Sequence, residues 1–253
     1  MTPAVRIRDR SNISIDLVDF PSAGGSVRAL LYHTRRPAAC VVLCHGYSAG
    51  KHNVDLLAYH LAIEGYVALA IDFQGHKLGA SSLPLARAED LLENALDAVA
   101  FAKEQPLVGR IVLGGHSMGA ATAIGAAVRS PDVAGVIAMC TALKRGDETA
   151  SAGLAGGLIN RAAYVDGAGP REITAAMDRC TARVADLAPR PLLVIAAAKD
   201  ALVAPSAVRQ LFDAAGEPKT YEVVDATHTD CAERARFAVV RWLRATGFEY
   251  AHD

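Results

Sequence analysis

The sequence lacks several features that would indicate a function by themselves. Its 253 residues contain neither a C-x-x-C nor an H-E-x-x-H motif, so ligand spacing predicts no metal site. The five cysteines are an odd number without the dense pattern of a small disulfide scaffold, and Cys44 and Cys140 lie in or at the end of apolar runs. We therefore expect buried free thiols and no disulfides.

The chain also lacks an excess of charge and a long hydrophobic run. It has 26 basic and 27 acidic residues in mixed order, a formal net charge of −1, so neither a nucleic acid nor an anionic membrane is expected as a partner. No run approaches the roughly 18 apolar residues of a membrane span, and residues 1–11 have no apolar core of a signal peptide. We expect a soluble cytoplasmic protein whose 52% hydrophobic residues build the core of one domain.

One stretch, residues 110–128, carries the strongest functional signal. A short apolar run typical of a buried strand is followed by a helix of small residues without proline. Gly115, Ser117 and Gly119 between them match G-x-S-x-G, in which the glycines leave room for a sharp reversal of the chain. The pattern predicts that Ser117 is a nucleophile at a helix N-terminus, where free N–H groups favour negative charge. The alternative is a tightly packed core helix after a glycine turn.

Strands and helices alternate through most of the chain, which predicts an α/β fold with a mostly parallel central sheet and helices on both faces. Two N-terminal strands joined by a turn-rich link predict an antiparallel hairpin at the sheet edge. The predicted strands are 13–20, 27–33, 40–44, 66–71, 111–113, 133–140, 191–197 and 220–224, and the predicted helices are 54–64, 85–105, 120–128, 205–214 and 230–245.

The alternation breaks after Cys140, because the next strand begins roughly 50 residues later, far beyond an ordinary connection. We expect a single domain of residues 1–253 with residues 141–189 as a small helical cap inserted over Ser117 at the carboxyl edge of the sheet. Its larger apolar residues either line a pocket or only fasten the cap to the body, and the sequence leaves both open: Leu154, Leu158, Ile159 and Tyr164.

Residues 45–52 have some features of a phosphate-binding loop. Such a loop needs four residues between its glycines and a Ser or Thr after its lysine. Here three residues separate Gly46 from Gly50, and His52 follows Lys51. Nucleotide binding is therefore not expected.

The same loop offers a different role. Gly46 lets the backbone turn so that the N–H of Tyr47 faces Ser117 as one oxyanion donor, and the N–H of Met118 supplies the other. Both donors are backbone groups, so the prediction rests on their positions in the chain.

A serine hydroxyl needs a neighbouring base. His228 lies in a predicted strand-to-helix loop downstream of the serine, whereas His252 is next to the end of the chain. His116 is adjacent to the serine and is predicted to point away from it as a packed, hydrogen-bonded core residue. Asp72 and His76 are expected to hold a loop together through backbone hydrogen bonds, with a catalytic role as the alternative. The base is therefore predicted to be His228.

The base needs a carboxylate that holds it in one tautomer. Asp200 lies just past the carboxyl end of a buried strand and is the predicted acid. Asp225 and Asp230 are the alternatives, and both are too close in sequence to His228 to orient it easily. The order along the chain is then Ser, Asp, His.

This order of motifs, from His45 to His228, resembles the α/β-hydrolase fold family. The loops 45–51 and 72–76 and the modest cap are similar to feruloyl and cinnamoyl esterases among the carboxylesterases. The resemblance implies Ser117 as nucleophile, His228 as base and then acid, and Asp200 as orienting carboxylate, with the oxyanion hole described above.

We therefore expect a serine hydrolase that cleaves a small-molecule acyl ester through an acyl-enzyme and needs no cofactor and no metal. Acyl thioesterase, peptidase and carbon–carbon bond hydrolase stay open, because the same triad serves all of them. A non-catalytic protein that binds a small ligand is the alternative from another class. The oligomeric state is left open.

Overall fold

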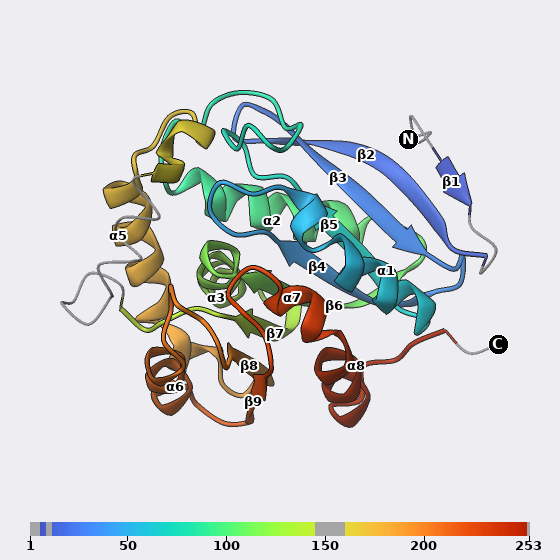
Figure 1. Cartoon of the computed structure of the whole chain (residues 1–253). Helices are drawn as coiled ribbons and strands as arrows, with labels where there is room; N and C mark the ends of the chain where they lie inside the picture. The colour runs from blue at the N-terminus through green and yellow to red at the C-terminus, as the bar shows by residue number, and fades with distance from the viewer. Residues whose placement is uncertain (1–5, 9–11, 145–159, 252–253) are drawn as a thin grey trace.

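The computed structural model describes residues 6–8, 12–144 and 160–251. Their strands form one nine-stranded sheet in the order β1-β2-β3-β5-β4-β6-β7-β8-β9 (Figure 1). β1 to β3 and the β3–β5 pair are antiparallel, and every further pair is parallel. The strands are β1 (Arg6–Arg8), β2 (Ser14–Ser22), β3 (Gly25–His33), β4 (Ala38–Cys44), β5 (Val67–Ile71), β6 (Val108–His116), β7 (Val133–Met139), β8 (Leu192–Ala197) and β9 (Lys219–Val224).

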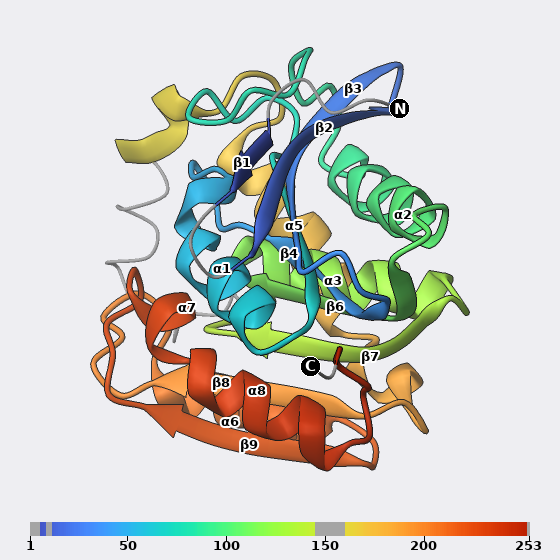
Figure 2. The same ribbon diagram turned by 90° about the vertical axis from the view of Figure 1, so that its right-hand side faces the viewer.

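Helices cover both faces of this sheet (Figures 1 and 2). One face packs against α2, α3, α5 and α6, and the other packs against α1, α7 and α8. The helices are α1 (Asp55–Ile63), α2 (Asp90–Lys103), α3 (Met118–Arg129), α5 (Pro170–Thr181), α6 (Pro205–Ala214), α7 (Cys231–Arg234) and α8 (Arg236–Ala245), with 3-10 turns η1 (Lys51–Asn53), η2 (Ala162–Tyr164) and η3 (Val184–Leu187). Because both faces are covered, all seven residues of β4 are buried.

The predicted α/β-hydrolase architecture is confirmed, and the differences from the sequence prediction are local. β2 and β3 form the predicted antiparallel hairpin, with the short β1 added outside it. α2 begins five residues later than predicted, because Leu85 pairs with Gly167 as an isolated bridge and Asp90 accepts a hydrogen bond from the Arg87 N–H. The single helix predicted at 230–245 is divided into α7 and α8 at Ala235.

Helical elements follow β7 in the segment predicted to be a cap, and this role stays a prediction. α5 packs against α3, where Cys180 lies close to Gly125. η2 lies beside the loop after β5, since the Lys77 N–H donates to the carbonyl of Tyr164. The side chain of Tyr164 is 47% exposed, so this residue fastens the segment through its backbone and does not line a buried pocket. Leu154, Leu158 and Ile159 lie outside the described residues.

The thiols follow the sequence prediction. All five cysteines are buried, and none forms a disulfide. Within the described residues, no helix is both long enough and apolar enough to cross a membrane.

Candidate active site

Ser117 occupies a strained turn between β6 and α3. Its φ of 54° and ψ of −113° fall outside the regions that a non-glycine residue ordinarily adopts. The turn is held by a hydrogen bond of 2.8 Å from the Ser117 N–H to the carbonyl of Met139 on β7. Such strain persists only where the surroundings impose it, and here it presents the serine side chain at the N-terminus of α3.

The two glycines of the motif are required by close backbone contacts. A Cβ at Gly115 would overlap the backbone of Gly119. A Cβ at Gly119 would overlap the carbonyl oxygen of Cys44 at the end of β4. The serine turn is therefore packed backbone to backbone against the neighbouring strand, which confirms the steric argument for G-x-S-x-G.

His228 and Asp200 come together from two loops. His228 Nδ1 donates a hydrogen bond of 2.7 Å to Asp200 Oδ2, and the carboxylate is fully buried. Its other oxygen, Oδ1, accepts the N–H groups of Leu202 and Val203, each at 2.8 Å. Burial acts to raise the pKa of Asp200, but the bond and charge of His228 with the two N–H groups outweigh it, so the pKa lies below its usual value. An ionised Asp200 fixes His228 with Nε2 as the free ring nitrogen.

His116 differs from its prediction. It is hydrogen-bonded, as expected, but it is half-buried and lines the same cavity as Ser117. Its Nε2 donates a hydrogen bond of 2.7 Å to the carbonyl of His228, and the two rings lie 4.7 Å apart between centroids. Burial, together with the nearby His228, lowers the pKa of His116 to about 3. His116 is thus a neutral donor that holds the backbone of His228, which adjacency in the sequence does not predict.

The loop after β4 passes close to Ser117. A Cβ at Gly46 would lie 3.5 Å from the Cβ of Ser117, so the backbone of this loop faces the serine. The first N–H groups of a helix have no intrahelical partner, which leaves the N–H of Met118 free at the start of α3. Within the described part of the chain, neither this N–H nor that of Tyr47 donates to an acceptor. Both N–H groups therefore stay candidates for the predicted oxyanion hole.

Sequence reasoning missed the role of His45. This fully buried side chain donates from Nδ1 to the carbonyl of Gly46 at 2.7 Å and accepts the Phe73 N–H at Nε2, at 3.0 Å. Burial and the neighbouring His76 lower the pKa of His45 to about 3, so the ring is neutral with its proton on Nδ1. The Gly46 carbonyl and the Tyr47 N–H belong to one planar peptide and point in opposite directions. By holding the carbonyl, His45 fixes the direction of the N–H.

Asp72 and His76 hold their loop as predicted. The carboxylate of Asp72 accepts the N–H groups of Lys51 and Ala80 at 2.7 and 2.8 Å and pairs with the Lys51 ammonium at 2.5 Å. His76 Nδ1 donates to the carbonyl of Gln74 at 3.1 Å. These bonds tie the loop after β4 to the loop after β5.

A cavity of about 220 Å³ brings the candidate residues together. Ser117 and His228 both line it. The hydroxyl of Ser117 makes no hydrogen bond within the described residues. The full lining is Gly46, Tyr47, Ala49, Asn53, His116, Ser117, Arg161, Leu202, His228 and Thr229. Asp200 lies beneath His228, and Asp225 is instead exposed and paired with Lys199. Asp230 caps Thr227 and pairs with Arg234, so neither alternative acid contacts His228.

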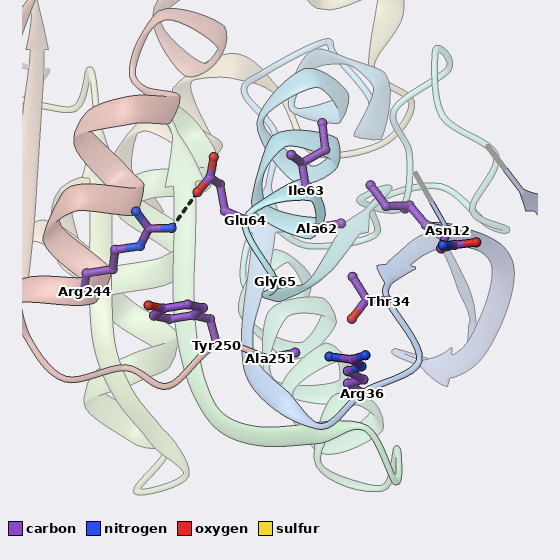
Figure 3. Close-up of a pocket in the computed structure, with 11 residues that line it drawn as sticks. Asn12, Thr34, Arg36, Ala62, Ile63, Glu64, Gly65, Arg244, Tyr250 and Ala251 are labelled. Atoms are coloured by element: carbon purple, nitrogen blue, oxygen red, sulfur yellow. Dashed lines mark hydrogen bonds and ion pairs between the residues drawn. The ribbon is translucent and has the colours of Figure 1, made fainter. Parts of the chain in front are cut away.

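A larger cavity of about 490 Å³ lies between the end of α1 and the C-terminal segment (Figure 3). Arg244 and Glu64 form an ion pair of 2.6 Å in its wall, and Arg36 and Tyr250 also face it. It shares no residue with the cavity at Ser117, and its described lining holds no serine, cysteine or histidine. The larger cavity is therefore not the candidate active site.

Three potential metal ligands lie within 4.8 Å of one another: His116, Cys140 and His228. Their protonation does not suit a cation. Nε2 of His116 carries the proton that it donates to a carbonyl, and a hydrogen bond with Cys231 together with burial raises the pKa of the Cys140 thiol well above its usual value. We interpret this group as a hydrogen-bonded cluster that supports His228.

A family model described as serine aminopeptidase, S33, matches residues 35–165, more than half of the chain. The chain belongs to this family of hydrolases. The match includes the loop after β4, the serine turn and Arg161, which all line the cavity at Ser117.

Solved structures share the fold over nearly the whole chain. A hypothetical protein from Pseudomonas aeruginosa has a TM-score of 0.74 at 17% identity, covering 97% of this chain and 99% of its own. Est1E from Butyrivibrio proteoclasticus, solved with ferulic acid bound, has a TM-score of 0.71 at 18% identity, covering 90% and 98%. A cold-adapted esterase from an Arctic intertidal metagenomic library has a TM-score of 0.70 at 16% identity, covering 97% and 99%. The chain has the α/β-hydrolase fold and is an enzyme of the hydrolase class.

Proposed function

We propose that this hydrolase cleaves carboxylic esters of small molecules through an acyl-enzyme, with Ser117 as nucleophile, His228 as general base and Asp200 as orienting carboxylate. The observation that carries the proposal is the 2.7 Å hydrogen bond from His228 Nδ1 to the buried Asp200, beside a serine on a strained turn in the same cavity. The esterases among the similar structures support an ester as the substrate class.

The proposed reaction has two halves. The Oγ of Ser117 attacks the ester carbonyl carbon while Nε2 of His228 takes the hydroxyl proton, and the carbonyl oxygen becomes an oxyanion that accepts the N–H groups of Tyr47 and Met118. The C–O bond to the alcohol breaks, and the alcohol leaves with the proton from His228. Water then gives a proton to Nε2 of His228 and attacks the acyl carbon. The bond from this carbon to Oγ breaks, the acid leaves, and His228 returns the proton to Oγ of Ser117.

An ester fits the cavity better than the amino-terminal peptide that the family description names. An aminopeptidase needs a carboxylate that receives the charged amino group of its substrate. The described lining of the cavity contains no aspartate or glutamate, and its charged side chain is Arg161. This cation disfavours an ammonium ligand.

We also propose that residues 141–189 act as a cap within a single domain of residues 1–253. Arg161, from this segment, lines the cavity, while α5 is anchored on α3. The proposal is that the segment determines which esters enter.

The test is the intact mass of the protein after treatment with a fluorophosphonate, for the wild type, Ser117→Ala, His228→Ala and the exposed-serine control Ser206→Ala. We expect one label on the wild type and the control and none on the other two variants. The rates with 4-nitrophenyl butyrate, its thioester analogue and an alanyl anilide then show whether the enzyme cleaves an ester, a thioester or an amide fastest. We expect ester turnover to fall by about 10³ or more in Ser117→Ala and His228→Ala. An unlabelled wild type that hydrolyses none of the three substrates faster than buffer would refute the proposal.

A further inference from the structure

The cavity at Ser117 has one wall that the chemistry of the triad leaves unused. Arg161 lines it from the segment before η2, and its guanidinium donates from Nη1 to the hydroxyl of Ser48 at 3.3 Å. Ser48 is fully buried and lies two residues after Gly46, whose backbone faces Ser117. This anchor keeps the cation beside the site of attack.

Arg161 differs in its partner from many other arginines of the described chain. Most of its exposed counterparts pair with a carboxylate within 4 Å: Arg28, Arg87, Arg179, Arg183, Arg209, Arg234, Arg241 and Arg244. Arg161 has a hydroxyl as its partner and no acidic side chain within that distance among the described residues. A guanidinium has five N–H donors, so most of its hydrogen-bonding capacity is left for a ligand.

The rest of the lining does not offset this charge. His116 is neutral, and the described lining includes no acidic residue. The other lining side chains are apolar, amide, hydroxyl or aromatic, and the cavity of about 220 Å³ suits a small ligand. The nearest lysine on the loop, Lys51, is already paired with Asp72. The lining of the cavity is therefore mostly uncharged, with the guanidinium of Arg161 as its positive charge.

We propose that the substrate is a small ester that carries a carboxylate, which Arg161 binds while Ser117 attacks the ester carbonyl. The inference rests on the proposed function, because it names the substrate class of that site. The planar guanidinium matches a carboxylate in a two-point hydrogen bond, and such charge-assisted bonds are about twice as strong as neutral ones. The carboxylate of the substrate lies on either its acyl or its alcohol part, and Arg161 would bind it through the same hydrogen bonds in both cases.

The test compares two matched pairs of esters. The acyl-side pair is mono-4-nitrophenyl adipate and its methyl-capped form, and the alcohol-side pair is 4-acetoxybenzoate and its methyl ester. The rates of each pair are measured on the wild type, Arg161→Gln, Arg161→Lys and Arg171→Gln, an exposed arginine of the same segment that serves as the control. Spontaneous hydrolysis is subtracted with Ser117→Ala.

We expect the wild type to prefer the charged member of one pair, and the ratio of the two kcat/KM values to fall by about 10- to 100-fold in Arg161→Gln. Arg161→Lys should retain part of the preference, because it keeps the charge without the planar fork, and Arg171→Gln should keep the wild-type ratio. If the ratio of kcat/KM for the charged and neutral esters is the same in the wild type and Arg161→Gln for both pairs, while ester turnover is intact, the inference about Arg161 is wrong. The proposed function would still stand. A wild type that hydrolyses neither pair and takes no fluorophosphonate would overturn the proposed function, and the inference with it.

Discussion

The two walls of the cavity at Ser117 are held by different means. The core wall, formed by Gly46, Tyr47, His116, Ser117 and His228, is fixed by backbone packing and hydrogen bonds. The outer wall, formed by Asn53, Arg161, Leu202 and Thr229, consists mainly of exposed side chains. If the proposed function holds, substitution in the core wall should disturb the geometry of the reaction, whereas substitution in the outer wall should change which substrate binds. Reaction type and substrate choice would then depend on physically separate parts of one cavity.

The largest effect is expected from two glycine substitutions, one at the serine turn behind the core wall and one before α5. Gly119→Ala should lower the free energy of unfolding by about 3 kcal/mol or more, because the new methyl group overlaps the carbonyl of Cys44 and backbone atoms cannot move aside. Gly169→Ala, on the cap side, has nothing within 4 Å and an ordinary φ of −77°, so its change should stay within about 1 kcal/mol. Urea unfolding measures both. Equal stability of the two variants would show that the serine turn is not rigidly packed.

A smaller effect is expected when the loop after β4 loses the hydrogen bond from His45. His45→Gln keeps an acceptor for Phe73 but removes the donor to the Gly46 carbonyl, whereas His45→Asn keeps a donor near the position of Nδ1. We expect kcat for a neutral aryl ester to fall by about 10- to 100-fold in His45→Gln, with less change in KM and a smaller loss in His45→Asn. His52→Asn, an exposed histidine of the same loop, is the control. Equal losses in the Gln and Asn variants would contradict the positioning role.

The smallest effect concerns the neutral histidines behind the core wall. Burial lowers the pKa of His76 to about 4, while an unfolded histidine titrates near about 6.5. Between these values the unfolded state binds the proton and the folded state does not, so stability decreases as the pH falls from about 6.5 towards 4. His76→Gln should remove about 1 kcal/mol of the decrease measured by urea unfolding between pH 6.5 and pH 5, a range in which most carboxylates stay ionised. If the free energy of unfolding of His76→Gln decreases between these pH values as much as that of the wild type, other groups cause the acid sensitivity.

The sequence predicted the parts of the site that depend on local pattern. The glycines around Ser117 and the apolar strands fixed the turn, because steric exclusion and alternation act between residues that are close along the chain. The positions of Asp200 and His228 after their strands were enough to predict that both lie at the carboxyl edge of the sheet. The family and the fold followed from the same motifs.

The failures have a common physical cause. His116 was expected to point away from Ser117, and only the contact with the backbone of His228 brings it into the cavity wall. The late start of α2 depends on a bridge between Leu85 and Gly167, which are distant in sequence. Neither contact leaves a pattern in the neighbouring residues.

By itself, the sequence determined the fold, the strained serine turn and the order of the candidate triad, because these follow from short-range sterics and hydrophobic periodicity. Only the tertiary structure decided which side chains meet across loops: His45 on the Gly46 carbonyl, His116 on the His228 carbonyl and Arg161 in the wall opposite the serine. The contacts of His116 and Arg161 join residues 112 and 113 positions apart. His45 contacts the adjacent Gly46, but its ring also accepts the N–H of Phe73 on another loop. A hydrogen bond forms where folding brings donor and acceptor within about 3 Å, and the sequence around either partner alone does not contain that distance.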